Sequence, residues 1–98
     1  SLYKYYLCNS KLVYRLELTS LGEVISIVRD QVVVRIRDPL RIPSIGARAV
    51  HKLSGRVIGA VNDIIGPISS PYAVIKLSKG ASVAVGDEIL YEVRRRSR

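Results

Sequence analysis

The residues whose chemistry could support catalysis or metal binding are few in this sequence, which contains one histidine, His51, and one cysteine, Cys8. Metal sites and acid–base relays need several such groups close together, so a lone histidine lacks partners. The Ala-Val-His-Lys-Leu context of His51 is more typical of a strand edge than of a ligand. One cysteine cannot close an internal disulfide. We therefore predict no metal, no cofactor and a reducing, cytoplasmic location.

Motifs of nucleophilic and phosphate-binding sites are also missing from the sequence. No serine lies in a Gly-x-Ser-x-Gly elbow, and the segment between Gly80 and Gly86 lacks the Gly-Lys-Ser/Thr of a P-loop. Asp63 and Asp87 stand where turns are expected and have no paired carboxylate in the pattern. We predict no catalytic residue and no enzyme activity, although a barrel of the flavin-reductase type can bind a cofactor without such motifs.

The chain is strongly basic, with 16 Lys and Arg against 8 Asp and Glu and a net charge of +8. Such a surplus attracts polyanions such as RNA, whereas an Arg-rich surface can also serve solubility or thermal stability. The basic run at the end of the sequence is expected to be a flexible, solvated tail that rests on phosphates. Its candidate RNA contacts are Arg94, Arg95, Arg96 and Arg98.

The six tyrosines give little support for a surface that stacks RNA bases. Four of them, Tyr3, Tyr5, Tyr6 and Tyr14, lie within the first fourteen residues. A sheet that binds single strands interleaves aromatic and basic residues over adjacent strands. The central segments of this chain carry Val and Ile instead, so a stacking platform is not expected.

The elements that would position these residues are β-strands. With 98 residues the chain fits one domain, and its apolar content of 48% is rich in Val and Ile, which favour a pleated sheet. Segments 38–46 and 66–71 contain prolines and are predicted loops, and at most one turn of helix is expected, near residues 44–50. Alternating or apolar runs predict about six short strands, as in a small barrel or sandwich, at 14–19, 22–28, 31–37, 55–61, 72–77 and 88–93.

These patterns predict one β-barrel domain over residues 14–93. A partly ordered N-terminal segment over 1–13 and a basic tail over 94–98 are expected on either side of it. No apolar run is long enough to span a bilayer, so no membrane association is expected.

Residues 55–77 read GRVIGAVNDIIGPISSPYAVIKL. This run is similar to the signature of the Gar/Naf family, and in particular to the archaeal form of the small Gar-type subunit of H/ACA pseudouridylation particles. Weaker similarity extends over residues 14–93, and the absence of Arg-Gly-Gly repeats favours the archaeal form. The positions that match the signature are Gly55, Val57, Asp63, Ile64, Ile65, Gly66, Pro67, Ile68, Pro71, Tyr72, Val74 and Lys76.

The resemblance implies an all-β fold, a small closed six-stranded barrel of the reductase and elongation-factor type. It implies no activity of its own. The partner would be the catalytic subunit of a pseudouridine synthase, bound near the mobile loop that closes over substrate RNA, so that the subunit promotes turnover in rRNA pseudouridylation. The particle would also contain a guide RNA, a Nop-type protein and a kink-turn-binding protein, and direct RNA contact by this subunit would be little or none.

An apolar outer face is expected beside the Gly-Pro turn. If Val57, Gly59 and Val61 point inward, Ile58 points outward, and the next strand leaves Tyr72 and Val74 outward. Exposed apolar patches usually mark partner surfaces, although isoleucines of the loop can instead cap the barrel end as ordinary core. The candidate partner-binding residues are Ile58, Ile65, Gly66, Pro67, Ile68, Pro71, Tyr72 and Val74.

Two other functions stay open. A free-standing RNA-binding barrel acting in ribosome maturation or translation would fit the charge, but it requires basic and aromatic residues on one sheet face. An assembly factor of the same family would share the barrel.

Overall fold

The computed structural model describes residues 4–9 and 12–97, and this part of the chain is all β-structure without a helix. Because the described residues include no helix, none is present that could cross a membrane. The strands are β1 (Lys4–Asn9), β2 (Leu12–Val28), β3 (Gln31–Ile36), β4 (Arg48–His51), β5 (Val57–Ile65), β6 (Tyr72–Leu77) and β7 (Glu88–Ser97).

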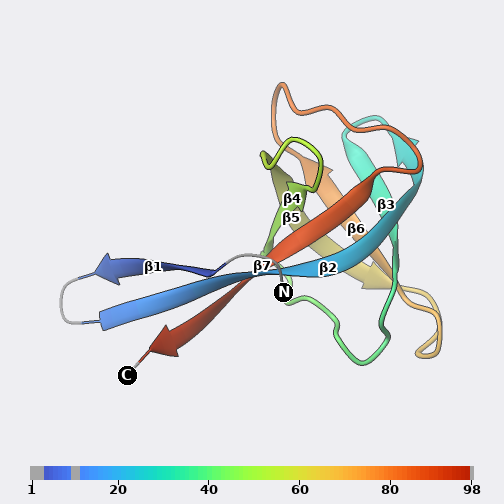
Figure 1. The fold of residues 1–98 in the computed structure, drawn as a ribbon. Helices are drawn as coiled ribbons and strands as arrows, with labels where there is room; N and C mark the ends of the chain where they lie inside the picture. The colour runs from blue at the N-terminus through green and yellow to red at the C-terminus, as the bar shows by residue number, and fades with distance from the viewer. Residues whose placement is uncertain (1–3, 10–11, 98) are drawn as a thin grey trace.

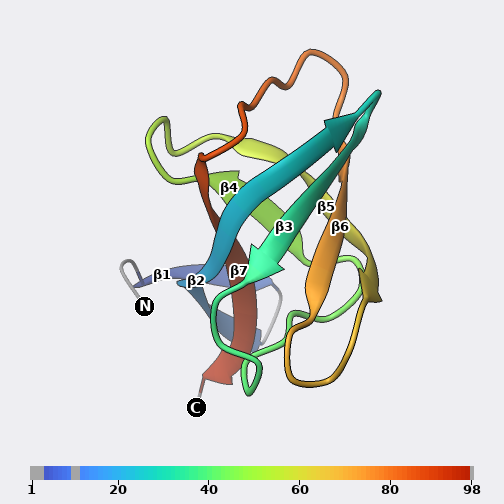
Figure 2. The same cartoon turned by 90° about the vertical axis from the view of Figure 1, so that its right-hand side faces the viewer.

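Six of these strands close into a barrel (Figures 1 and 2). Their order around the barrel is β2-β3-β6-β5-β4-β7, and pairing of β7 with β2 closes the ring. All of the pairings are antiparallel. Closure leaves the barrel wall without a free edge. The prediction of a small closed six-stranded barrel is confirmed.

Strand β2 is longer than the barrel wall, and its first half leaves the barrel. The two strands expected at 14–19 and 22–28 are therefore one element. Register shifts against β7 at Ser20/Gly22 and against β3 at Val24/Ser26 mark β-bulges, which bend a strand and increase its twist.

The outer half of β2 is the middle strand of a three-stranded extension, which we call the arm. The arm consists of β1, residues 12–17 of β2 and residues 93–97 of β7, and it projects from the barrel (Figure 1). The expected boundaries after residues 13 and 93 thus fall inside β2 and β7. Strand β7 continues past residue 93 to Ser97, and Arg98 of the expected tail lies outside the described residues.

Strand β4 was not anticipated, because a turn of helix was expected near residues 44–50. The structure instead has a turn at Ile45 and Gly46, where the Ala47 N–H donates to the Ser44 carbonyl at 3.0 Å. The four residues of β4 follow and pair with β5 and β7. Four residues are too few to display a periodicity that distinguishes a strand from a helix.

The orientation expected for Ile58 was also wrong. Ala49 pairs with Gly59 and Val50 pairs with Val57, so Ile58 is an extra residue of β5 at a β-bulge. The bulge interrupts the alternation: Ile58 is 3% exposed and belongs to the core, whereas Val57 is 45% exposed. A regular two-residue alternation would instead bury Val57 and expose Ile58.

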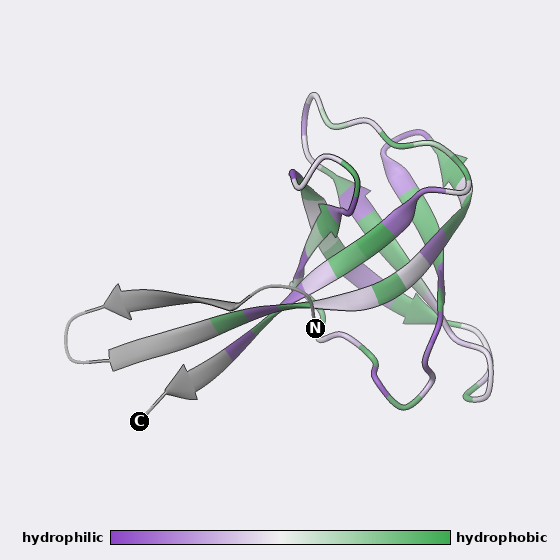
Figure 3. Cartoon of the chain, in the orientation of Figure 1, coloured by the Kyte–Doolittle hydropathy of each residue, from purple (hydrophilic) through white to green (hydrophobic). Residues whose placement is uncertain are grey.

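The interior of the barrel is filled mainly by β-branched and other aliphatic side chains. Figure 3 shows hydrophobic residues alternating with hydrophilic ones along the barrel strands. Ala73 and Ile75 of β6 point inward as expected, and Leu77 packs against the same core. The largest fully buried side chains come from β2, β3, β5, β6 and β7; they are Leu21, Ile75, Ile89, Val24, Val32, Val34 and Val61.

Candidate functional site

The loop between β5 and β6 presents apolar side chains to solvent. Ile65, the last residue of β5, is 43% exposed, and Ile68 in the loop is 91% exposed. Ile64 behaves differently, because it is half-buried and packs against the barrel core. Ile64 therefore packs against the barrel, as one interpretation of the sequence expected, whereas Ile65 and Ile68 are exposed, as the other expected.

The backbone of this loop is held in place by local contacts. Gly66 has φ +91°, and a Cβ there would lie 2.9 Å from Cδ2 of Tyr72, so the tyrosine ring packs directly against the glycine. The Ser70 N–H donates to the Pro67 carbonyl at 3.0 Å, which closes a turn around Ile68. A surface held in one conformation loses little entropy when a partner binds.

The other candidate partner-binding residues divide into exposed and buried ones. Tyr72 and Val74 are half-buried and alternate with the buried Ala73 and Ile75, which agrees with outward positions on β6. Pro71 is buried, and its carbonyl accepts from the Ile36 N–H at 3.2 Å, so it fastens the loop to β3. Because Ile58 and Pro71 are buried in this chain, they can shape a partner surface but offer it little contact area.

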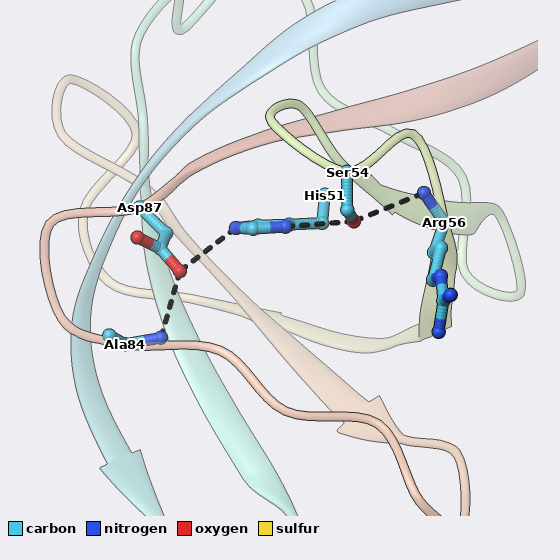
Figure 4. Close-up of polar contacts among 5 residues, drawn as sticks. All are labelled: His51, Ser54, Arg56, Ala84 and Asp87. Atoms are coloured by element: carbon cyan, nitrogen blue, oxygen red, sulfur yellow. Dashed lines mark hydrogen bonds and ion pairs between the residues drawn. The ribbon is translucent and has the colours of Figure 1, made fainter.

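His51 has partners that the sequence did not reveal (Figure 4). Its Nε2 lies 2.9 Å from Oδ2 of Asp87, and its Nδ1 lies 3.0 Å from Oγ of Ser54. Asp87 is 36 residues away in sequence but begins the approach to β7, next to the end of β4. Only the three-dimensional pairing of β4 with β7 brings these side chains together.

The arrangement has the composition of a Ser-His-Asp relay, but its hydrogen bonds fasten two turns. Ser54 Oγ also accepts from the Arg56 N–H at 3.3 Å, and Asp87 Oδ2 accepts from the Ala84 N–H at 2.9 Å. The network therefore joins the β4–β5 turn to the loop before β7. The bond from the Ala84 N–H is the main reason why the pKa of Asp87 lies below its ordinary value, and His51 contributes further.

Metal binding has no support in the described residues, among which no cluster of three or more His, Cys, Asp and Glu side chains could hold an ion. The basic residues are distributed over the barrel and the arm. Arg37 forms an ion pair with Glu88, and Arg94 is exposed on β7. Arg95 and Arg96 lie on the same strand, opposite Arg15 and Tyr14 of β2.

A small closed barrel with a filled interior, an exposed apolar loop and a basic arm is a binding module. A family model described as the Gar1/Naf1 RNA binding region matches residues 18–97, and the chain belongs to this family. Its members are non-catalytic subunits of ribonucleoproteins related to H/ACA particles. No curated protein matches the sequence.

The barrel is also similar to a solved structure described as the structure of the Gar1 domain of NAf1. The TM-score is 0.64, with 18% identity, and the match covers 91% of this chain and 93% of that one. Likeness at this identity concerns the fold alone.

Proposed function

We propose that the chain is an archaeal Gar-type subunit of an H/ACA guide-RNA particle, and that it binds the catalytic subunit of the pseudouridine synthase. In this role it promotes substrate turnover in rRNA pseudouridylation and performs no chemistry itself. The observation that supports the proposal most directly is the exposed, conformationally fixed loop that presents Ile65 and Ile68.

The physical argument rests on apolar area that the chain itself does not cover. Complete burial of one isoleucine side chain contributes about 1.5 to 3 kcal/mol, and Ile68 is 91% exposed. Ile65 and Tyr72 pair at the ends of β5 and β6 that the loop joins and add partly exposed apolar surface there, and Val74 lies two residues further along β6. Turn contacts around Gly66 hold the loop in one conformation. Little conformational entropy is therefore lost when a partner binds, and this loss offsets little of the free energy gained by burying the apolar side chains.

The test is a calorimetric titration of the chain into the synthase subunit, comparing Ile68→Asp with Leu53→Asp. Leu53 is a matched control, because it is 92% exposed in the β4–β5 turn, which is a different loop. We expect Ile68→Asp to weaken binding by at least tenfold, since a buried unpaired charge costs several kcal/mol, and Leu53→Asp to leave it unchanged. Normal affinity of a folded Ile68→Asp variant would place the synthase surface elsewhere.

Turnover provides a second readout of the same proposal. Adding the wild-type chain to synthase and guide RNA is expected to raise the multiple-turnover rate of pseudouridine formation, whereas adding the Ile68→Asp variant should not.

A free-standing RNA-binding barrel, the second candidate, is favoured by the net charge of +8 and by the RNA-binding description of the family. A barrel of this kind would bind bare guide RNA at physiological salt, and the Ile68→Asp substitution would leave that binding unchanged.

A further inference from the structure

A shallow groove of about 540 Å³ lies on the outer face of the barrel wall, across the neighbouring strands β4, β5 and β6 (Figure 1). The end of the β3–β4 loop borders it, fastened to β5 by the Gly46 N–H, which donates to the Val61 carbonyl at 2.7 Å. The groove shares no lining residue with the loop that presents Ile65 and Ile68. Its centre at Ala60 lies five residues before Ile65 on β5, roughly 15 Å along the strand. The groove is therefore a separate surface.

One row of the sheet crosses the middle of this groove. Arg48 pairs with Ala60, which pairs with Lys76 on the other side. Directly opposite residues of an antiparallel sheet share one face. Arg48 and Lys76 are exposed, whereas their neighbours Ala49 and Ile75 are fully buried, so the row points outward. The row thus places a single methyl group between two cationic side chains.

The floor of the groove is small and aliphatic. Gly59 lies beside Ala60, and a Cβ at Gly59 would overlap the carbonyl oxygen of Lys76, so no side chain can fill that part of the floor. Ile45 of the β3–β4 loop and Val57 of β5 stand on either side of the row and are 61% and 45% exposed. No aromatic side chain is among the described residues that line the groove. The groove therefore offers apolar surface that suits an aliphatic group.

The charge of the groove is positive and is not neutralised by its own lining. Arg48 and Lys76 are the charged residues along it, and neither forms an ion pair within the part of the chain that the structure describes. Asp63, the acidic residue of β5, accepts from the Ile64 N–H at 2.8 Å. A larger groove on the other side of Arg48 differs, because Glu92 lines it as well. A ligand of the smaller groove must therefore bring its own negative charge.

The spacing of the row fits an extended polypeptide that crosses the strands. Neighbouring strands lie about 4.8 Å apart, so Arg48 and Lys76 each start about 4.8 Å from Ala60. Residues two apart in an extended chain point the same way and lie about 6.7 Å apart. With one residue placed over Ala60, the residues two before and two after it lie about 2 Å beyond the two cations. The flexible stems of lysine and arginine cover that difference.

We propose that the groove binds an extended acidic segment of a second partner protein, with the pattern acidic-x-apolar-x-acidic. The central apolar side chain lies on Ala60 between Ile45 and Val57, and the two carboxylates pair with Arg48 and Lys76. A polypeptide is favoured over RNA, because the aliphatic lining has no ring on which a base could stack and a phosphate backbone has no apolar group to cover it. The proposal goes beyond synthase docking and does not rest on it.

The first test varies the ligand. The full chain is titrated into a fluorescein-labelled peptide of sequence GSESLSESG, and binding is followed by fluorescence anisotropy. The peptide GSESSSESG lacks the apolar anchor, and GSQSLSQSG lacks the carboxylates. We expect loss of the leucine to weaken binding by roughly tenfold or more, and loss of both carboxylates by roughly 2- to 30-fold. Equal affinities for the three peptides would overturn the proposal.

The second test varies the chain. Arg48→Gln/Lys76→Gln is compared with Arg29→Gln/Lys52→Gln, which removes the same charge from two exposed residues that do not line the groove. The groove variant should lose roughly 2- to 30-fold in affinity for GSESLSESG and bind GSQSLSQSG as the wild type does, whereas the control should bind both peptides normally. Equal losses in the two variants would mean nonspecific attraction and would overturn the assignment. Ala60→Ile fills the floor without changing the charge, and unchanged affinity of this folded variant would also refute the proposal.

Titrations with the synthase subunit and with a 12-nucleotide oligouridine RNA separate this proposal from the other partners. Arg48→Gln/Lys76→Gln should bind the synthase as the wild type does and bind the RNA as the charge-matched control does. A loss of synthase binding would make the groove part of the synthase surface, and a loss of RNA affinity beyond that of the control would make it a nucleic-acid surface. Either result would overturn the assignment to a second protein. Failure of Ile68→Asp to weaken synthase binding would leave the peptide results unaffected.

Discussion

Replacing Gly66 by alanine tests whether the fixed conformation of the β5–β6 loop is what the synthase binds. The backbone at Gly66 has φ +91°, a region that costs a residue with a Cβ about 1 to 2 kcal/mol. The new Cβ would also lie 2.9 Å from Tyr72 Cδ2 and 3.2 Å from the Ser70 carbonyl oxygen. Relieving that overlap moves the Tyr72 ring and adds about 1 to 3 kcal/mol. We expect a total loss of roughly 2 to 5 kcal/mol in the free energy of unfolding.

Gly80→Ala is the matched control, because it isolates the backbone part of this loss. Gly80 has φ +84°, yet a Cβ there would meet nothing within 4 Å. Urea denaturation should therefore show a loss of only about 1 to 2 kcal/mol for Gly80→Ala. Synthase affinity should fall for Gly66→Ala, where the Tyr72 ring and the loop move, and stay unchanged for Gly80→Ala. Equal stability losses, or unchanged synthase affinity in a folded Gly66→Ala variant, would refute the reasoning.

Two further predictions concern the barrel. Ile58→Ala should lower the free energy of unfolding by about 2 to 5 kcal/mol in urea denaturation, whereas Val57→Ala, at the exposed position beside it, should cost less than about 1 kcal/mol. A larger loss of unfolding free energy for Val57→Ala than for Ile58→Ala would contradict the orientation that the bulge gives these two residues. For Asp87, the folded pKa lies below the ordinary value of 3.8, so its contribution to stability is present above that value and is lost as pH falls through the folded pKa. The stability difference between wild type and Asp87→Asn should shrink in that acidic range, and a difference that is constant with pH would exclude the carboxylate as its source.

Periodicity in the sequence predicted the barrel because most barrel strands alternate, and β6 illustrates this well. Ala73 and Ile75 point inward, while Tyr72 and Val74 alternate with them. The prediction failed where the backbone departs from regular pairing. Ile58 sits at a bulge that reverses its orientation, and β4 has only four residues. Neither feature leaves a local pattern, since a bulge is defined by the register of two strands and a short strand by its neighbours.

The residues that meet at the candidate sites are determined even more by pairing between strands that are distant in the sequence. The exposure of Ile65 and Ile68 could be expected from the sequence because a glycine and a proline between them mark a loop locally. The partners of His51 were not found, because Asp87 is 36 residues away. Tyr14 and Arg96 are still more distant in the chain, yet β2 and β7 place them opposite each other. Strand β2 continues beyond the barrel and pairs with both β1 and the last residues of β7, which no local sequence pattern indicates.

The pairing of β2 explains how the arm is joined to the barrel. Along one edge β2 pairs with β7 from Val13 to Glu23, with a bulge at Ser20/Gly22. Its other edge pairs with β3 from Gly22 to Val28, inside the barrel, and with β1 from Leu12 to Glu17, outside it. Unpaired backbone groups along an exposed strand invite aggregation, so an extended β2 needs a neighbour where β3 ends. Strand β1 meets that need by pairing with β2 from Leu12 to Glu17.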